Sequence, residues 1–368
     1  MKTTHTKKLL ICLTLLSLFI ITPLSSAKLR SNYLIDFISN NRISESEGFT
    51  NAIEFSGSIS YEATYYALDM LSDFNQMNIH VDPVLLAENL GKAIYYLFEY
   101  QTIDLHDLYY LLSSLNILGQ IDDIITSNSS LNGKIIDYIN QTAQITGGFT
   151  MKNTTSTPTV ISTFYGIKNY ELINEILDNE LIHVNWLLTC NNSDGGFGGN
   201  STSISDLSPT YYAALALDNL NSYDNLTSTN KDNITQYAKD FYLSNGGYRP
   251  DLALTQTVIW STYYSIKLIS MIPNPEYNDR DSTINWILDR QNILDGGFSD
   301  PSAESGVQNS SIISSYNAYR ILSVLNALGS LNNEIGIVEF NWVILLAILV
   351  VIGVVVGLLF FLWKRRQI

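Results

Sequence analysis

The sequence predicts an all-α protein: an α/α toroid of six helical-hairpin repeats, each of about 50 residues, plus one C-terminal transmembrane helix. Three observations predict the repeat. A glycine followed by an aromatic residue recurs along the chain, another aromatic residue stands 11 or 12 positions before each of these markers, and a tyrosine-rich apolar stretch follows each one. Strand-type alternation of apolar and polar residues is scarce.

The spacing of the markers sets the number of repeats. The last three intervals are 48, 51 and 50 residues, whereas the first is 100 residues, twice the usual length. One unit has therefore lost its marker, and Tyr100-Gln101-Thr102 stands in the expected place. Six units then fill residues 30–330. The markers are Phe49, Phe149, Phe197, Tyr248 and Phe298.

Each unit is expected to contain two helices. The first carries the aromatic residue that precedes the marker and ends at the glycines, because glycine adopts positive φ at little cost. The second opens near an aromatic doublet such as Tyr211-Tyr212, and Ser208 followed by Pro209 reads as its cap and first position. These second helices are apolar on most sides, which favours an inner ring over the alternative of an open solenoid.

The repeat resembles that of a known family. Asp194-Gly-Gly-Phe-Gly-Gly199 and Ser208-Pro-Thr-Tyr-Tyr-Ala-Ala-Leu215 look like the repeat of protein prenyltransferase β-subunits. Gln291-Asn292 with Asp295-Gly-Gly-Phe298 is similar to the same repeat and to its relatives in the terpenoid cyclases. The resemblance covers most of residues 30–330, and it implies a toroid around a funnel-shaped central cavity.

The catalytic motifs of that family are missing. The resemblance implies a zinc site made of an Asp-x-Cys pair and a later histidine, but Cys190 has no aspartate two positions before it and no histidine follows His183. The Asp-x-Asp-Asp acid of the cyclases is also absent, since Asp122-Asp123 lacks the preceding acid. The sequence therefore predicts no metal and no cofactor, and it argues against an enzyme.

One polar cluster remains a tentative catalytic candidate. Asp104, His106 and Asp107 lie at the start of the second unit's inner helix, where they suit an acid–base pair or a mixed metal site. The alternative is a helix cap beside a surface histidine. Isolated polar residues near the other inner-helix starts are Glu62, Asp206, Gln256, Glu304 and Gln308.

The predicted ligand surface is a belt of tyrosines. They occupy matching positions in the inner helices, so they should lie at one level of the ring, facing either the cavity or the outer helices. Arg249 is a further candidate ligand-binding residue, because it is a cation expected near a mouth of the cavity. The belt consists of Tyr66, Tyr110, Tyr165, Tyr212, Tyr264 and Tyr316.

The two ends of the chain predict a membrane-anchored surface protein. Residues 1–27 have the basic start, short apolar core and small-residue exit of a signal peptide. The stretch 342–363 carries no charge and suits a membrane-spanning helix, with 331–341 as linker and the basic tail 364–368 in the cytoplasm. The toroid at 30–330 is then extracellular, on a single-pass protein of the cell membrane.

Charge restricts the partners. Of the 20 lysines and arginines, eight lie in the two ends, so the rest of the chain carries 12 cations against 35 carboxylates, net −23. This excludes nucleic acid, whose phosphates require clustered cations. Removal of Cys12 with the signal leaves Cys190 alone, so no internal disulfide forms. An apolar, glycan or protein ligand remains.

These observations predict a non-catalytic receptor that captures a ligand or partner in or around an aromatic-lined cavity. Two alternatives stay open. One is an extracellular enzyme, either a carboxylate-dependent glycan hydrolase or lyase, or a divergent prenyl or terpenoid transferase or cyclase. The other is a rigid spacer whose cavity is filled by its own side chains.

Overall fold

The computed structural model describes residues 28–52, 57–300 and 310–335, and near the C-terminus residues 353, 355, 357 and 361–365. The chain divides into two compact units, one of residues Ser31–Asn332 and one of its two ends, Met1–Arg30 and Asn333–Ile368. The predicted signal peptide and most of the predicted membrane span lie outside the described residues. None of the helices within the described residues has both the length and the apolar character that a bilayer crossing needs.

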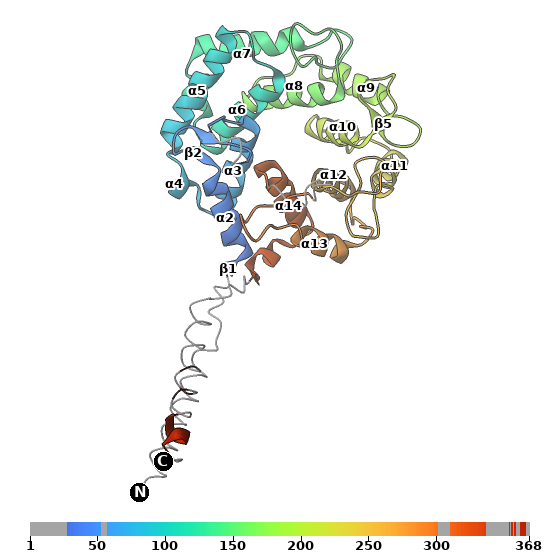
Figure 1. Ribbon diagram of the computed structural model, residues 1–368. Helices are drawn as coiled ribbons and strands as arrows, with labels where there is room; N and C mark the ends of the chain where they lie inside the picture. The colour runs from blue at the N-terminus through green and yellow to red at the C-terminus, as the bar shows by residue number, and fades with distance from the viewer. Residues whose placement is uncertain are drawn as a thin grey trace. The chain divides into compact units, whose positions relative to one another are not determined.

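Six helices form a closed ring at the centre of the larger unit (Figure 1). Each contacts the next in chain order, and the last, α14, contacts the first, α3. Equivalent tyrosines of neighbouring helices meet, as Tyr66 does with Tyr110 and Tyr165 with Tyr212. The inner helices are α3 (Tyr61–Asp73), α6 (Leu105–Ile117), α8 (Val160–Leu172), α10 (Leu207–Asn219), α12 (Ile259–Ser270) and α14 (Ile312–Val324).

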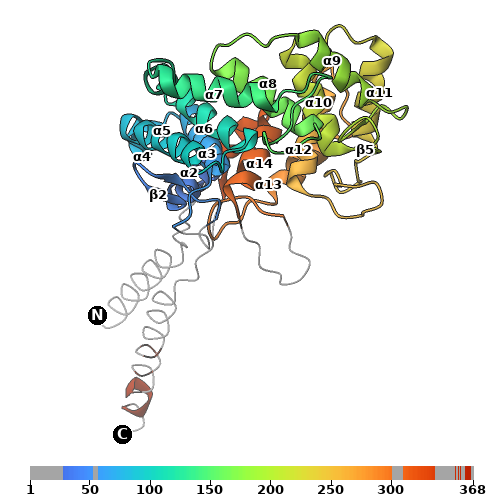
Figure 2. The same cartoon turned by 90° about the horizontal axis from the view of Figure 1, so that it is seen from above.

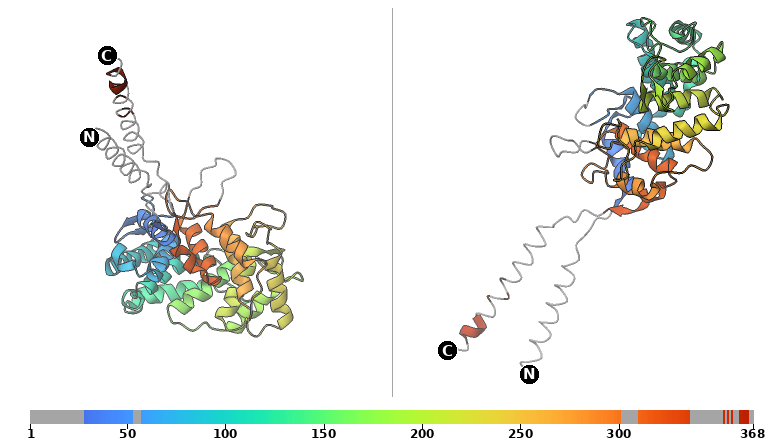
Figure 3. Two further views of the ribbon diagram at one scale, coloured as in Figure 1. Left: turned by 90° about the horizontal axis from the view of Figure 1, so that it is seen from below. Right: turned by 90° about the vertical axis from the view of Figure 1, so that its right-hand side faces the viewer.

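A second set of six helices surrounds the inner ring, and Figures 2 and 3 show both layers from other sides. Each outer helix precedes its inner partner in the chain, which confirms the predicted toroid of six helical hairpins. The outer helices are α2 (Arg30–Asn40), α5 (Pro83–Glu99), α7 (Ser129–Thr142), α9 (Glu180–Thr189), α11 (Ser228–Lys239) and α13 (Arg280–Leu288).

The remaining elements are short. In the larger unit, β2 (Arg42–Ser44) pairs with β3 (Gly48–Phe49) and β4 (Phe197–Gly198) with β5 (Ser205–Asp206), both antiparallel and both at a marker. In the terminal unit, β1 (Lys28–Leu29) pairs antiparallel with β6 (Glu334–Ile335). The others are α4 (Met77–His80), a π-helical turn (Asp122–Thr126) and a 3-10 turn (Leu328–Asn332).

Polar caps fix where most inner helices begin. Asp104 caps α6, because its side chain accepts a hydrogen bond from the backbone N–H of Asp107. The cap of α10 is Asp206, whose Oδ1 accepts from the N–H of Ser208 at 2.8 Å, so the prediction that Ser208 is the cap was wrong. Pro209 consequently lies within the first turn, where its missing N–H leaves no bond unmade.

The glycine pairs exist because neighbouring units approach closely there. Gly296 has φ +92°, and a Cβ on it would stand 2.1 Å from the carbonyl oxygen of Tyr33 on α2. A Cβ on Gly297 would stand 2.8 Å from the ring of Phe37 on the same helix. Where the previous unit has a glycine pair, the aromatic residue before a marker thus packs on that pair, as Trp286 also does on Gly247. At Gly296 and Gly297 the glycines of the last unit pack on α2 of the first unit, so the contact that joins successive units also closes the ring.

A hydroxyl locks each marker to the inner helix of its unit. The backbone N–H of the marker donates to a threonine or serine directly before the aromatic doublet. The second unit has Leu108 at this position, so it lacks both the marker and the acceptor. The five bonds are Phe49 to Thr64 (3.0 Å), Phe149 to Thr163 (2.9 Å), Phe197 to Thr210 (2.8 Å), Tyr248 to Thr262 (3.0 Å) and Phe298 to Ser315 (2.9 Å).

Polar contacts also join the last unit to the first. The N–H of Ile312 donates to the carbonyl of Asn51 at 2.8 Å, and the hydroxyl of Tyr319 on α14 donates to Asp73 on α3 at 2.9 Å. These bonds connect residues more than 240 positions apart in the chain. They establish a closed ring in place of the open solenoid.

Candidate functional site

Aromatic side chains from all six inner helices meet at the middle of the ring. All six tyrosines of the predicted belt line the central cavity, and so do the other members of the doublets. The volume that remains is about 140 Å³. The lining consists of Tyr65, Tyr66, Tyr109, Tyr110, Phe164, Tyr165, Tyr211, Tyr212, Tyr263, Tyr264 and Tyr316, with Leu215 and Asn317.

These rings pack against one another across the helix boundaries. Tyr66 and Tyr316 stack with ring centroids 3.9 Å apart, at the junction where the ring closes. Tyr211 and Tyr264 stack at 4.0 Å and are parallel within 3°. Aromatic pairs of this kind add to the stability that burial of their surface provides. The centre of the ring is therefore packed as a core.

The phenol hydroxyls bond mainly to one another. Tyr66 and Tyr110 lie 2.8 Å apart at their oxygens, and Tyr110 donates to Oε1 of Glu62 at 3.0 Å. On the other side, Tyr212 bonds to Tyr165 and to Tyr264, each at 3.3 Å. These bonds satisfy buried polar groups without any ligand.

Burial raises the pKa of the phenols. It is the largest cause for each of them, and the pKa values of Tyr66, Tyr110 and Tyr212 lie well above the ordinary value of tyrosine. They are thus neutral at physiological pH. A neutral phenol donates a hydrogen bond, but it does not serve as a general base or a nucleophile.

The cation beside the cavity is already paired. Arg320, one turn beyond Tyr316 on α14, donates from Nε to the Tyr316 hydroxyl at 3.1 Å. Its guanidinium also forms ion pairs with Asp69 and Asp73 of α3. Two carboxylates thus offset its charge, which leaves little attraction for a diphosphate.

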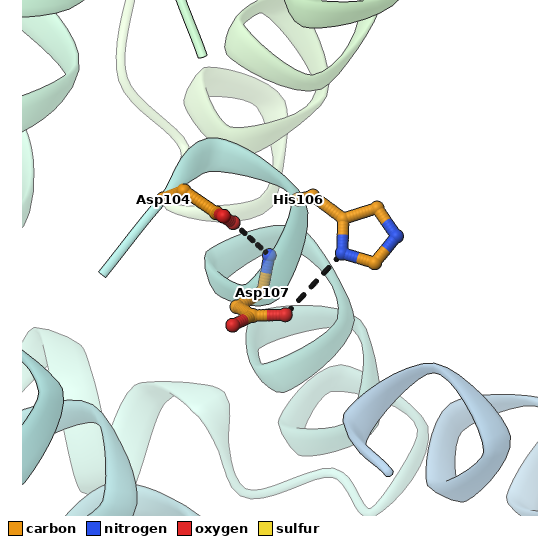
Figure 4. A group of neighbouring side chains, drawn as sticks. All are labelled: Asp104, His106 and Asp107. Atoms are coloured by element: carbon orange, nitrogen blue, oxygen red, sulfur yellow. Dashed lines mark hydrogen bonds and ion pairs between the residues drawn. The ribbon is translucent and has the colours of Figure 1, made fainter. Parts of the chain in front are cut away.

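The tentative catalytic cluster lies at the N-terminal end of α6, on a rim of the ring, and Figure 4 shows its three side chains. His106 Nδ1 is 3.3 Å from Asp107 Oδ1, and one ligand atom from each of Asp104, His106 and Asp107 lies within 4.8 Å of the others. The structure adds Glu62 from α3, whose Oε2 is 3.9 Å from His106 Nε2. The cluster therefore joins two units, and Glu62 links it to the hydroxyl of Tyr110.

Carboxylates on both sides of His106 change its protonation. Burial by itself lowers the pKa of His106, but the hydrogen bond to Asp107 and the negative charges nearby outweigh this effect and raise the pKa above its ordinary value. Its ring also meets those of Tyr110 and Tyr165 edge-on, with centroids 4.8 and 5.2 Å away. The folded state therefore favours the imidazolium form.

We expect the stability that His106 provides to depend on pH. A group with a raised folded-state pKa stabilises fully below its unfolded pKa, about 6.5 for histidine, and this stabilisation is lost as pH rises through the folded value. The side chain is 36% exposed, so solvent limits the effect to about 1 kcal/mol or less. The melting midpoint of His106→Gln should lie further below that of wild type at about pH 5.5 than at about pH 8.5. The same difference in melting midpoint at both pH values would contradict the pairing of His106 with its neighbouring carboxylates.

The remaining candidates lie apart from the cavity lining. Arg249 donates to the backbone carbonyls of Asp240 and Leu254 near its own loop. Asp206 is engaged as a cap. Glu304 and Gln308 lie outside the described residues. Whether Arg249 or the belt binds a ligand stays a prediction.

Cys190 and His183 have structural surroundings. Burial raises the pKa of the Cys190 thiol to about 11, so it is not a thiolate at neutral pH. His183 Nδ1 accepts a hydrogen bond from the N–H of Gly148 at 3.1 Å, and its ring stacks on Phe149 at 4.6 Å. Neither residue is poised as a metal ligand.

Comparison with known proteins agrees with this architecture. The family described as prenyltransferase alpha-alpha toroid domain matches residues 1–152, 85–180 and 160–340. No curated protein matches the chain.

Solved structures with the same fold carry different activities. Protein geranylgeranyltransferase-I of Candida albicans is similar with TM-score 0.63 and 16% identity, over 83% of this chain and 93% of that one. A type II terpene cyclase from Scytonema has TM-score 0.53 and 15% identity over 82% and 97%. An α-1,6-mannanase from Salegentibacter has TM-score 0.50 and 13% identity over 82% and 98%. At these identities the likeness concerns the fold alone.

Proposed function

Since this chain belongs to the prenyltransferase α-α toroid domain family, we propose that it uses the family's scaffold as a non-catalytic binding module whose ring centre is closed by its own tyrosines. Any ligand or partner is then bound around the ring, on its rims or outer surface. The module is held outside the cell by the apolar segment 342–363.

One observation carries this proposal: the volume left at the ring centre. About 140 Å³ remains among the tyrosines, whereas sites for drug-sized ligands run from roughly 300 to 1,000 Å³. A prenyl chain would have to displace stacked rings such as Tyr211 and Tyr264, and it would break hydroxyl bonds that are now satisfied.

The chemistry of the described residues supports the same conclusion. The phenols are neutral, Arg320 is paired with carboxylates, and Cys190 is a buried thiol. None of these groups suits the activation of a thiol, the binding of a diphosphate or the protonation of an alkene. The rim cluster remains available for binding a polar group.

The proposed lack of catalysis is tested by an assay for prenyl transfer, the reaction that this fold supports in protein geranylgeranyltransferase-I. The full-length chain in detergent, given geranylgeranyl diphosphate, a thiol acceptor, Mg²⁺ and Zn²⁺, should release no pyrophosphate above background. Release that His106→Gln abolishes would overturn the proposal. Protease added to intact host cells should also digest the ring, whereas full protection would contradict an extracellular toroid.

A second candidate is a carboxylate-dependent glycan hydrolase or lyase, and one arrangement favours it. Glu62, His106 and Asp107 lie together at a rim that solvent reaches, on two different inner helices. Such an enzyme would bind its substrate across the rim and leave the ring centre filled. Glycan cleavage that is lost in Asp107→Asn, with the melting midpoint unchanged, would establish this alternative.

A further inference from the structure

A groove on the outside of the ring is larger than the central cavity. It lies between the C-terminal end of α5 and α7, and its volume of about 420 Å³ falls in the range of ligand sites. Phe98 on α5 and Ile103 supply apolar lining, and the loop after the third unit's marker forms one side. We call it the α5–α7 groove.

Exposed tyrosines gather at the same end of α5. Tyr95, Tyr96 and Tyr100 are 53%, 60% and 61% exposed, and no other aromatic side chain among the described residues of Ser31–Asn332 is as accessible. The rings of Tyr96 and Tyr100 lie 4.3 Å apart. Lys134 Nζ lies 4.8 Å from the centre of the Tyr95 ring, and Lys134 lines the groove, so Tyr95 stands at its edge. Clustered exposed rings of this kind mark a binding surface.

The groove also holds two cations without carboxylate partners. Six of the other cations on the ring form ion pairs with aspartate or glutamate, for example Lys168 with Glu171 and Lys231 with Asp224. Among the described residues, no carboxylate lies within ion-pair distance of Lys134 or Lys152, and both line the groove. On so acidic a protein, two such ammonium groups in one groove favour an anionic ligand.

The other polar groups of the groove suit hydroxyls. Asp137 accepts hydrogen bonds only, whereas Gln141 and Asn153 each donate and accept, and all three residues line the groove. The Asn153 amide donates to Gln141 at 2.9 Å, which orients both. An apolar peptide side chain in this place would take water from these groups without offering them a hydrogen bond, which is unfavourable. Sugar hydroxyls would satisfy them.

We propose that the α5–α7 groove binds an acidic saccharide, a chain of sugars that carry carboxylates. The carboxylates pair with Lys134 and Lys152, the hydroxyls bond to Asp137, Gln141 and Asn153, and apolar sugar faces stack on the tyrosines at the end of α5. The proposal names a ligand class for the binding module inferred above. It rests on that function only in treating the toroid as a module that binds on its outside.

Binding is measured by calorimetry with the full-length chain in nanodiscs and a short oligogalacturonate as probe. Asn153-Thr154-Thr155 is an N-glycosylation sequon, so the chain is made in a host that does not glycosylate it. We expect saturable binding at micromolar to millimolar concentration that weakens as salt rises. Lys134→Gln with Lys152→Gln should lower the affinity at least tenfold, and Tyr95→Ser should lower it several-fold.

Matched controls distinguish specific binding in the groove from nonspecific attraction of the ligand to positive charge. Lys92→Gln with Lys239→Gln removes the same two charges outside the groove lining and should leave the affinity within twofold of wild type. The fully methyl-esterified oligosaccharide should bind at least tenfold more weakly than the acid. No saturable binding, equal binding of acid and ester, or an equal loss in both lysine pairs would each overturn the proposal. Those outcomes leave the closed ring centre and the absence of catalysis untouched, because binding of geranylgeranyl diphosphate and the pyrophosphate assay test these separately.

Discussion

Gly296→Ala should destabilise the toroid by roughly 4 kcal/mol or more, a loss that is exceptional for a single methyl group. Two causes act together. Gly296 has φ +92°, which an L-residue adopts only with strain, and the new Cβ would stand 2.1 Å from the carbonyl oxygen of Tyr33. That oxygen belongs to the backbone of α2, so no rotamer change relieves the clash. The melting midpoint should fall by about 6 °C for a unit of this size.

Gly57→Ala is the matched control for this substitution. Gly57 has nearly the same backbone angle, φ +96°, but among the described residues no atom beyond its chain neighbours lies within 4 Å of the Cβ that alanine would add. It should therefore cost only the strain, about 1–2 kcal/mol. Equal losses in the two variants would show that the last glycine pair does not close the ring against α2.

Tyr211→Ala should cost roughly 3–5 kcal/mol, the range for removal of a large buried aromatic side chain. Tyr211 is 7% exposed and stacks on Tyr264, and its hydroxyl lies 3.4 Å from that of Tyr263. The substitution removes a stacked ring, leaves a void and takes a partner from a buried hydroxyl. Thermal or urea unfolding of the full-length chain in detergent measures the loss.

The same change at an exposed tyrosine provides the comparison. Tyr95→Ala removes a ring that is 53% exposed, so its effect should stay within about 0.5 kcal/mol. If Tyr211→Ala cost no more than this, the tyrosines would line an open, solvent-filled channel. The packing described for the ring centre would then be wrong.

The repeat could be predicted from the sequence because its contacts repeat. Most units meet their neighbours through the same glycine pair, the same aromatic residue and the same doublet, so selection leaves the same pattern about every 50 residues. The threonine or serine before each doublet also recurs, as Thr210 and Thr262 show, yet its role was not foreseen. Hydroxyls are common throughout this chain, so that signal is visible only once the marker N–H is known to need a partner.

Two features of the site depend on distances that a sequence does not contain. Equivalent positions place the tyrosines at one level, but the space left between their rings follows from the radius of the ring. Glu62 and His106 are 44 positions apart, and only the contact between α3 and α6 brings their side chains together. Asp104 could be anticipated as a cap, because a single helix start defines that role. The α5–α7 groove combines two units and a loop, with no motif of its own.

The most direct test of the closed ring centre is equilibrium binding of geranylgeranyl diphosphate to the full-length chain, followed by native mass spectrometry from detergent. Tyr211→Ala, provided that it remains folded, is the comparison with an enlarged centre. The filled centre predicts no saturable 1:1 complex for the wild-type chain, because about 140 Å³ does not admit the prenyl group. A stoichiometric wild-type complex that Tyr211→Ala alters would contradict it.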